Sequence, residues 1–247
     1  GSEMWAQGWS EPGAGSDMAA IRCRADRDGD EFVINGQKIW STRAVFADWV
    51  FCLLRTDPES SRHHGLSFIL VPLDAPGVTV RPIPQLNGLP GFAEIFFDDV
   101  RVSDFNLIGE EGGGWAIAMA TAGFERGLML RSPARFQQAS KRLVELYRQR
   151  QNDILDLSIE DSVVRCYMDA EAYALSTYQT ASRLINNGAI GPESSCNKIF
   201  WSELDLSIHE TAMSLLGAKA EIEPGSPDAD QQLSNWLDGF LFAQSGP

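Results

Sequence analysis

Residues 7–17 read Gln7-Gly8-Trp9-Ser10-Glu11-Pro12-Gly13-Ala14-Gly15-Ser16-Asp17. This segment combines a proline and several glycines with two serines, which is the composition of a turn that carries hydroxyl groups. Because glycine has no Cβ, such a turn can bring backbone N–H groups close to a flat ligand. Trp40-Ser41-Thr42 adds an indole ring and hydroxyl groups in strand-like sequence. Alone, each segment is more typical of an ordinary turn or a core strand than of a binding site.

The composition is that of a globular protein with enough apolar residues for a sizeable core. The chain has 247 residues, 44% hydrophobic and 22% charged, and its length allows one or two domains. Its formal net charge of −14 argues against nucleic acid and anionic membrane surfaces as partners, since both are negatively charged. No apolar run approaches the ~18 residues of a membrane span, so we expect no membrane insertion.

The cysteine and histidine patterns give no sign of a metal site or a disulfide framework. The four cysteines are scattered, without a Cys-x-x-Cys pair, and His63-His64 has no further ligand at metal-binding spacing. Free cysteines fit a reducing compartment. With no signal peptide at its start, the chain is expected in the cytoplasm of a bacterium or, in a eukaryote, in the mitochondrial matrix.

Residues 18–103 have the pattern of a β domain. Alternating apolar residues on both sides of Asp28-Gly29 predict a hairpin. Apolar runs predict further strands at 49–54, 66–71, 78–80 and 93–97. Short strands separated by turn residues indicate a small β-barrel or sandwich that ends near residue 103.

Beyond residue 112 the apolar period becomes that of helices. Gly112-Gly113-Gly114 lacks the Lys-Ser/Thr of a phosphate-binding loop and is interpreted as a flexible lead into a helix. Pro133 should kink or break the second helix. The expected helices cover 115–122, 124–150, 163–185, 201–215 and 229–244, with Asn187-Gly188 and Gly217 as C-cap positions. The last four of these helices, joined by short connections, favour an antiparallel bundle, so we predict an α+β chain with domains 1–108 and 109–247.

In their order and spacing, these segments resemble the acyl-CoA dehydrogenase family. Ser10 to Asp17 matches the flavin-binding signature of that family at every position, and further matches follow at 34–42, 97–102, 112–115 and 124–127. The resemblance implies a β-barrel middle domain followed by a C-terminal four-helix bundle. It also implies an N-terminal helical domain that would precede Gly1 and is absent from this sequence.

The resemblance further implies an FAD enzyme. The family removes the α-proton and the β-hydride of an acyl-CoA thioester, which yields the trans-2-enoyl-CoA, and passes the electrons to an electron-transfer flavoprotein. This reaction needs a carboxylate beside the α-carbon, polarisation of the thioester carbonyl and a flavin on the opposite face.

Residue roles are carried over position by position. The resemblance gives as cofactor-binding positions Gln7, Trp9, Ser10, Gly15, Ser16, Trp40 and Thr42. It gives as substrate-binding positions Ser16, Phe124 and Arg126, and Glu125 as the catalytic base. We expect Glu125 at the start of a helix, where the helix dipole favours its negative charge. A glutamate there is also a common stabiliser of its own helix, and some branches of the family carry the base on a C-terminal loop beyond Pro247.

Two departures from the family pattern bear on partners. Residues 147–155 lack the Phe-Gly element that grips the FAD of a neighbouring subunit, and the loop near the neighbour's adenosine reads Leu216-Gly217-Ala218-Lys219. We therefore expect a homo- or hetero-oligomer of acyl-CoA dehydrogenase-like subunits, with a related partner supplying the adenosine grip. The alternatives are an oxygen-using flavoprotein, namely an acyl-CoA oxidase or a flavin monooxygenase, and a non-catalytic partner subunit.

Overall fold

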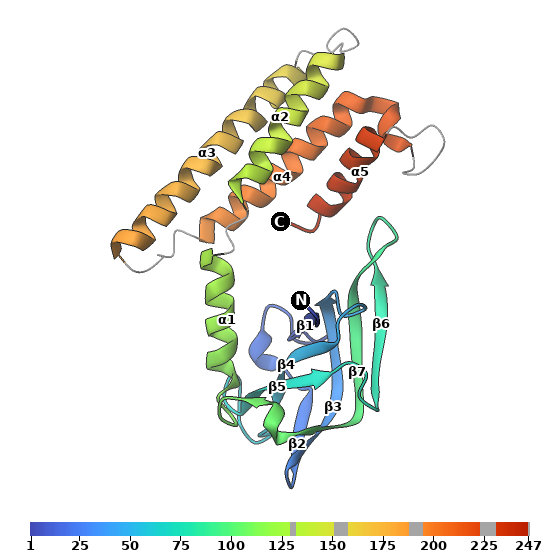
Figure 1. The fold of residues 1–247 in the computed structure, drawn as a ribbon, viewed down its shortest axis with the longest axis vertical. Helices are drawn as coiled ribbons and strands as arrows, with labels where there is room; N and C mark the ends of the chain where they lie inside the picture. Colours follow the sequence, from blue (N-terminus) through green and yellow to red (C-terminus); the bar gives the residue numbers. More distant parts are fainter. Residues whose placement is uncertain (129–131, 151–157, 188–194, 223–230, 247) are drawn as a thin grey trace. The chain divides into compact units, whose positions relative to one another are not determined.

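The computed structural model describes residues 1–128, 132–150, 158–187, 195–222 and 231–246. The chain divides into two compact units, Gly1–Ala122 and Gly123–Pro247. Figure 1 shows that the strands belong to the first unit and that α2 to α5 belong to the second. The predicted α+β class, with a β domain followed by helices, is confirmed.

The first unit is built on an eight-stranded mixed sheet. Its strands are β1 (Trp5–Gly8), β2 (Arg24–Asp28), β3 (Glu31–Thr42), β4 (Trp49–Arg55), β5 (Leu66–Pro72), β6 (Val78–Pro84), β7 (Pro90–Ser103) and β8 (Leu107–Ile108). The strand order runs β6-β7-β3-β2-β4-β5-β8, and β1 pairs in parallel with β4. The four strands predicted from apolar runs are confirmed as β4 to β7. The predicted hairpin joins β2 to β3 through Gly29, whose φ is +66°.

The two longest strands, β3 and β7, form the most extensive strand pair of this sheet. They pair antiparallel from Glu31 opposite Ser103 to Thr42 opposite Phe92, with two shifts in register. The second shift falls between Lys38 and Ser41, and Trp40 there takes a φ of +59°. Because a bulge re-aims side chains, Trp40 is turned outward and is 57% exposed.

Helix α1 (Gly114–Leu128) follows the sheet. The predicted glycine-rich lead is confirmed as the start of a helix, but it is packed against β5. The Gly112 N–H donates to Ser67 Oγ at 2.8 Å, and a Cβ on Gly114 would stand 2.5 Å from the Ser67 carbonyl carbon. The predicted second helix start near residue 124 is wrong, because α1 continues through residues 124–126. Its alanine- and methionine-rich sequence favours an unbroken helix, and Gly123 alone does not end it.

The second unit is a helical bundle of α2 (Pro133–Arg150), α3 (Ser158–Asn187), α4 (Ser195–Leu216) and α5 (Gln231–Ala243). Figure 1 shows successive helices of the bundle running in opposite directions, as predicted. Pro133 is the first residue of α2, where its missing N–H costs nothing, so the predicted break there is confirmed. Gly217 ends α4 with a φ of +56°, also as predicted. The start predicted for the last helix, at about 229, lies outside the described residues.

The bundle has its own buried core, made of apolar side chains from all four helices, among them Phe136, Leu143, Tyr173, Ile208 and Trp236. Among the described residues, no helix is long and apolar enough to cross a lipid bilayer.

Candidate functional site

The glycine-rich turn lies beside the end of β3. The Ile39 N–H donates to the Ser10 carbonyl at 2.9 Å, and Glu11 and Ala14 exchange two backbone hydrogen bonds of 3.0 Å that close the turn. The segment 10–17 and the segment 40–42 are therefore neighbours in the first unit. The sheet brings together the two stretches that carry most of the predicted cofactor positions.

A buried ion pair supports this turn from below. Lys38 is fully buried and Glu11 is 9% exposed, and Lys38 Nζ lies 2.8 Å from Glu11 Oε1. The ammonium also donates to the carbonyls of Trp9, at 3.2 Å, and Leu53, at 2.7 Å. Its three donors are therefore all used.

The Glu11 carboxylate is satisfied in the same way. It accepts the backbone N–H groups of Arg22, at 2.7 Å, and Cys23, at 2.9 Å, in addition to Lys38. Burying two charges costs free energy unless they are paired and hydrogen-bonded, which is the arrangement here. Glu11 and Lys38 thus fix the position of the turn.

Sequence reasoning missed both of these residues. Charged residues are almost always expected at the surface. The alternation of β3 could have revealed Lys38, because side chains two residues apart point to the same face of a strand. Lys38 is therefore on the same face as the buried Phe32 and Ile34. A lysine on the inward face of a strand requires a buried partner.

The seven predicted cofactor positions all belong to the first unit, on β1, on the turn that follows it and at the end of β3. Trp9 is buried, whereas Gln7 and Ser10 are half-buried. The exposed positions are Gly15, Ser16, Trp40 and Thr42.

Two buried polar atoms at this site lack a hydrogen-bond partner among the described residues. They are Trp9 Nε1 and Ser41 Oγ, whose residues are 6% and 1% exposed. Native proteins pair the large majority of such atoms, so an unpaired one calls for an explanation. In the turn, Gly13 and Gly15 have nothing within 4 Å of where a Cβ would stand. Trp9 itself packs in an apolar cluster with Leu53 and Phe68, so the part of the turn that is open to a flat ligand is the backbone at Gly13 and Gly15.

Trp40 adds backbone strain to the same place. Its positive φ is rare for a residue with a bulky side chain, and such outliers cluster at ligand sites. Its ring packs edge-on against Phe92, with the centroids 6.0 Å apart, and stays largely exposed. The positive φ thus leaves an aromatic face exposed near the end of β3.

The remaining predicted site residues, Phe124, Glu125 and Arg126, lie in α1 and belong to the second compact unit. Their approach to Ser10 and Thr42 stays a prediction. The expected position of Glu125 at a helix start is wrong: it lies in the last described turn of α1. Eleven residues beyond Gly114, it is outside the first turn, where the positive end of the helix dipole would stabilise a carboxylate.

A separate polar cluster is buried in the bundle. Arg135 Nη2 lies 2.8 Å from Asp205 Oδ2, and His209 Nδ1 lies 2.7 Å from the Asp205 carbonyl oxygen. A Cβ on Gly239 would stand 2.2 Å from His209 Nε2, so α5 packs directly on the imidazole. Burial lowers the pKa of His209. In the described part of the chain, no three His, Cys, Asp or Glu side chains gather as metal ligands.

Residues 6–100 match the acyl-CoA dehydrogenase middle domain, and residues 112–238 match the acyl-CoA dehydrogenase C-terminal domain. With the sheet, the glycine-rich turn and the helical bundle, these matches show that the chain belongs to the acyl-CoA dehydrogenase family. It is 38% identical over 254 residues to the acyl-CoA dehydrogenase IpdE1 of Mycobacterium tuberculosis, a match that covers 99% of this chain and 62% of that protein.

Two solved structures are similar as well. The first is the Tcur3481-Tcur3483 steroid ACAD, with a TM-score of 0.87, 30% identity, and coverage of 98% of this chain and 62% of that one. The second is the ChsE4-ChsE5 complex from Mycobacterium tuberculosis, with a TM-score of 0.81, 31% identity, and coverage of 96% and 62%. The chain thus spans 62% of the length of these relatives.

Proposed function

We propose that the whole protein is an FAD-dependent dehydrogenase that converts an acyl-CoA thioester to its trans-2-enoyl-CoA and passes the electrons to an electron-transfer flavoprotein. The family of the chain and the name of IpdE1 support this class of reaction. The observation that carries the proposal is the Ser10–Asp17 turn, which Lys38 and Glu11 hold beside the end of β3 and whose glycine backbone is open.

The cofactor would be held by the residues of the first unit. Ser10 and Thr42 would offer hydroxyl groups to the ring edge, and Trp40 would pack beside the ring. The backbone at Gly15 and the side chains of Gln7, Trp9 and Ser16 would complete the site, and Ser16 would also contact the substrate. FAD, when bound, supplies the acceptor for the hydride that leaves the β-carbon.

Glu125 would act as the base. Its carboxylate removes the α-proton, and the electron pair of that C–H bond becomes the second bond between the α- and β-carbons. Phe124 and Arg126 would contact the substrate beside it.

An anaerobic titration tests this assignment. The whole protein is mixed with a panel of acyl-CoA thioesters, including steroid-derived ones because of the similar steroid ACAD, and loss of flavin absorbance is followed. We expect Glu125→Gln to retain FAD but to lose bleaching by substrate. The matched control is Glu145→Gln, an exposed helix position of the bundle, which should bleach normally. Bleaching by Glu125→Gln at the native rate would overturn the base assignment and favour a glutamate outside residues 1–247.

The same experiment separates the competing functions. An oxygen-using flavoprotein would reoxidise within seconds when air is admitted, whereas a dehydrogenase would stay reduced until an electron-transfer flavoprotein is added. In a non-catalytic subunit, none of the acyl-CoA thioesters would bleach the flavin, even with FAD bound.

We further propose that the protein is a subunit of a bacterial, cytoplasmic heteromer. The names of both similar structures pair two different chains, Tcur3481 with Tcur3483 and ChsE4 with ChsE5. In this chain, Gly217–Glu221 form a short 3₁₀ helix after α4, at the position where the family approaches a neighbour's adenosine. A related subunit would supply the adenosine grip. An active, FAD-replete homotetramer from the whole chain alone would refute this proposal.

A further inference from the structure

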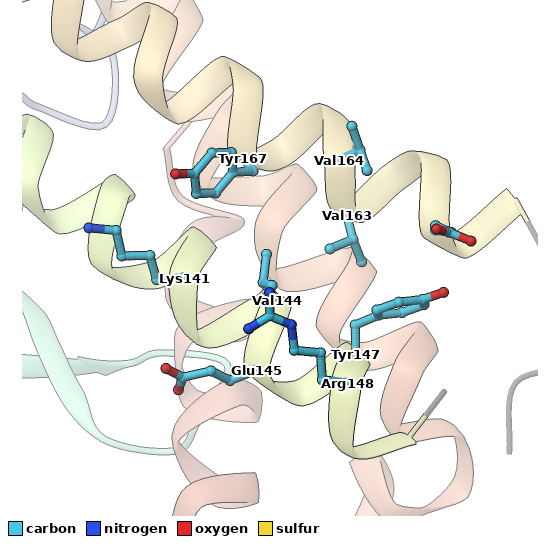
Figure 2. A pocket seen from close by; sticks show the side chains of 9 residues that line it. Lys141, Val144, Glu145, Tyr147, Arg148, Val163, Val164 and Tyr167 are labelled. Atoms are coloured by element: carbon cyan, nitrogen blue, oxygen red, sulfur yellow. The ribbon is translucent and has the colours of Figure 1, made fainter. Parts of the chain in front are cut away.

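Arg55, the last residue of β4, uses its whole guanidinium to bind backbone carbonyls. The guanidinium donates to the carbonyl oxygens of Ile21 (3.0 Å), Ala19 (3.2 Å), Ser60 (3.3 Å), Arg62 (2.7 Å) and His64 (2.9 Å). A guanidinium has five N–H donors, so all of them are used. Surface arginines usually keep this group in water, as Arg148 does beside the groove between α2 and α3 (Figure 2). Arg55 is instead half-buried and holds main chain.

The five carbonyls belong to two separate segments of the first unit. Ala19 and Ile21 come after the glycine-rich turn, at a short 3₁₀ helix that spans Met18–Ala20. The other three carbonyls belong to loop 56–65, which connects β4 to β5. Two of the bonds thus go to the segment after the turn and three go to the loop, so the guanidinium joins the two segments.

A second link joins the same two segments but is weaker. Arg62 Nη2 lies 3.3 Å from Asp17 Oδ1, and both side chains are mostly exposed. Exposed ion pairs contribute little, because water screens them. The bonds from Arg55 to Ala19 and Ile21 are partly shielded from water, where charge-assisted hydrogen bonds are stronger. The connection between the two segments therefore depends chiefly on Arg55.

Ser16 lies between two anchored points of the chain. Before it, the buried ion pair described above fixes the start of the turn. After it, Arg55 holds the segment 19–21. Gly15 has nothing within 4 Å of where a Cβ would stand, and Ser16 itself is exposed. Because so little packs on these two residues, the two anchors set the position of Ser16.

We propose that Arg55 is a positioning residue that holds Ser16 where the acyl-CoA thioester binds, by joining the segment after the turn to loop 56–65. This inference rests on the proposed function, which makes Ser16 a substrate contact. Lysine cannot take the place of Arg55. Its three donors radiate from one nitrogen, whereas the planar fork of a guanidinium can donate to carbonyls of both segments at once.

A substrate titration of Arg55→Lys in the whole protein tests the proposal. We expect the thioester concentration that gives half-maximal bleaching to rise at least about fivefold, while FAD content stays native and the saturated bleaching rate changes by less than about twofold. The matched control is Arg101→Lys, the same exchange at an exposed ion pair of the first unit, which should be native in all three measurements. A loss of FAD or of the saturated rate, without a change in the half-maximal concentration, would indicate a structural role only and would overturn the proposal.

A double-mutant cycle shows whether Arg55 acts through Ser16. Ser16→Ala should itself raise the half-maximal concentration. In the Ser16→Ala background, Arg55→Lys should add less than about a further twofold, because the contact that it would displace is already gone. Effects of the two substitutions that multiply in full would overturn the proposal.

Hydrogen exchange tests the connection without any substrate. In Arg55→Lys, peptides that cover 17–22 and 57–65 should exchange faster by at least about fivefold, whereas peptides from β6 and β7 should stay native. Native exchange in both segments would overturn the proposal. A native protein that no thioester bleaches would overturn the proposed function instead, and the exchange rates would still decide whether Arg55 holds the two segments together.

Discussion

Replacing Lys38 by methionine should destabilise the first unit strongly. The fully buried ammonium donates to Glu11, Leu53 and Trp9 at 2.8, 2.7 and 3.2 Å. Methionine keeps the reach of the side chain but leaves the buried Glu11 carboxylate without its cation. Removing one partner of a buried pair costs about 3–5 kcal/mol. Because two buried carbonyls also lose their donor, we expect the upper part of that range.

The assay is native-state hydrogen exchange of β3 and β4 in the whole protein, read as a local free energy of opening. The control is Arg101→Met, which removes exposed ion pairs of 2.9 Å to Asp28 and Glu31 and should cost under about 1 kcal/mol. The double variant Lys38→Met/Glu11→Gln should recover part of the loss. A loss for Lys38→Met no larger than that of Arg101→Met would refute the reasoning.

Three further outcomes follow from local geometry. Gly8→Ala should lower the free energy of unfolding by about 1–3 kcal/mol in thermal melts, since its Cβ would stand 2.7 Å from two β4 side chains. Gly13→Ala has open space around it and should leave Tm unchanged. Equal shifts in Tm for the two variants would contradict this reasoning. In the native protein, Ellman's reagent at pH 8 should titrate one fast thiol, and Cys196→Ser should remove it. The other three cysteines are buried, and burial raises the pKa of Cys23 to about 11. A second fast thiol would argue against this packing. Folding lowers the pKa of His209 below 6.5, so the unfolded chain binds more protons just below that pH. The free energy of unfolding of the second unit should therefore rise with pH and level off above about 6.5. In His209→Gln this pH dependence should flatten, and an unchanged pH dependence would assign it to other groups.

The elements were predictable where a periodic apolar pattern coincided with a turn or a cap. Asp28-Gly29, Pro133 and Gly217 marked boundaries that the structure has, because each residue type restricts or frees the backbone in a specific way. The helix start assumed near Phe124 failed because the segment before it contains no true breaker. A single glycine among alanines costs a helix about 1 kcal/mol, which is too little to end it.

The arrangement around the turn was only half predictable. The family signature pointed to the two segments that the sheet does bring together, but the pair of Lys38 and Glu11 and the positive φ of Trp40 depend on non-local pairing. The register shift that turns Trp40 outward exists only once β3 lies against β7, and no local pattern specifies it.

The pairing of Glu31 with Ser103 also has a consequence for biosynthesis. The two strands it joins are far apart in sequence, so β3 has no antiparallel partner on its outer edge until β7 has left the ribosome. At roughly 5–20 residues per second, this delay lasts several seconds, during which the edge of β3 and its apolar residues are open to chaperones or to misassociation. Slowing translation between residues 42 and 90 should therefore lower the yield of folded chain more than the same pause placed after residue 108.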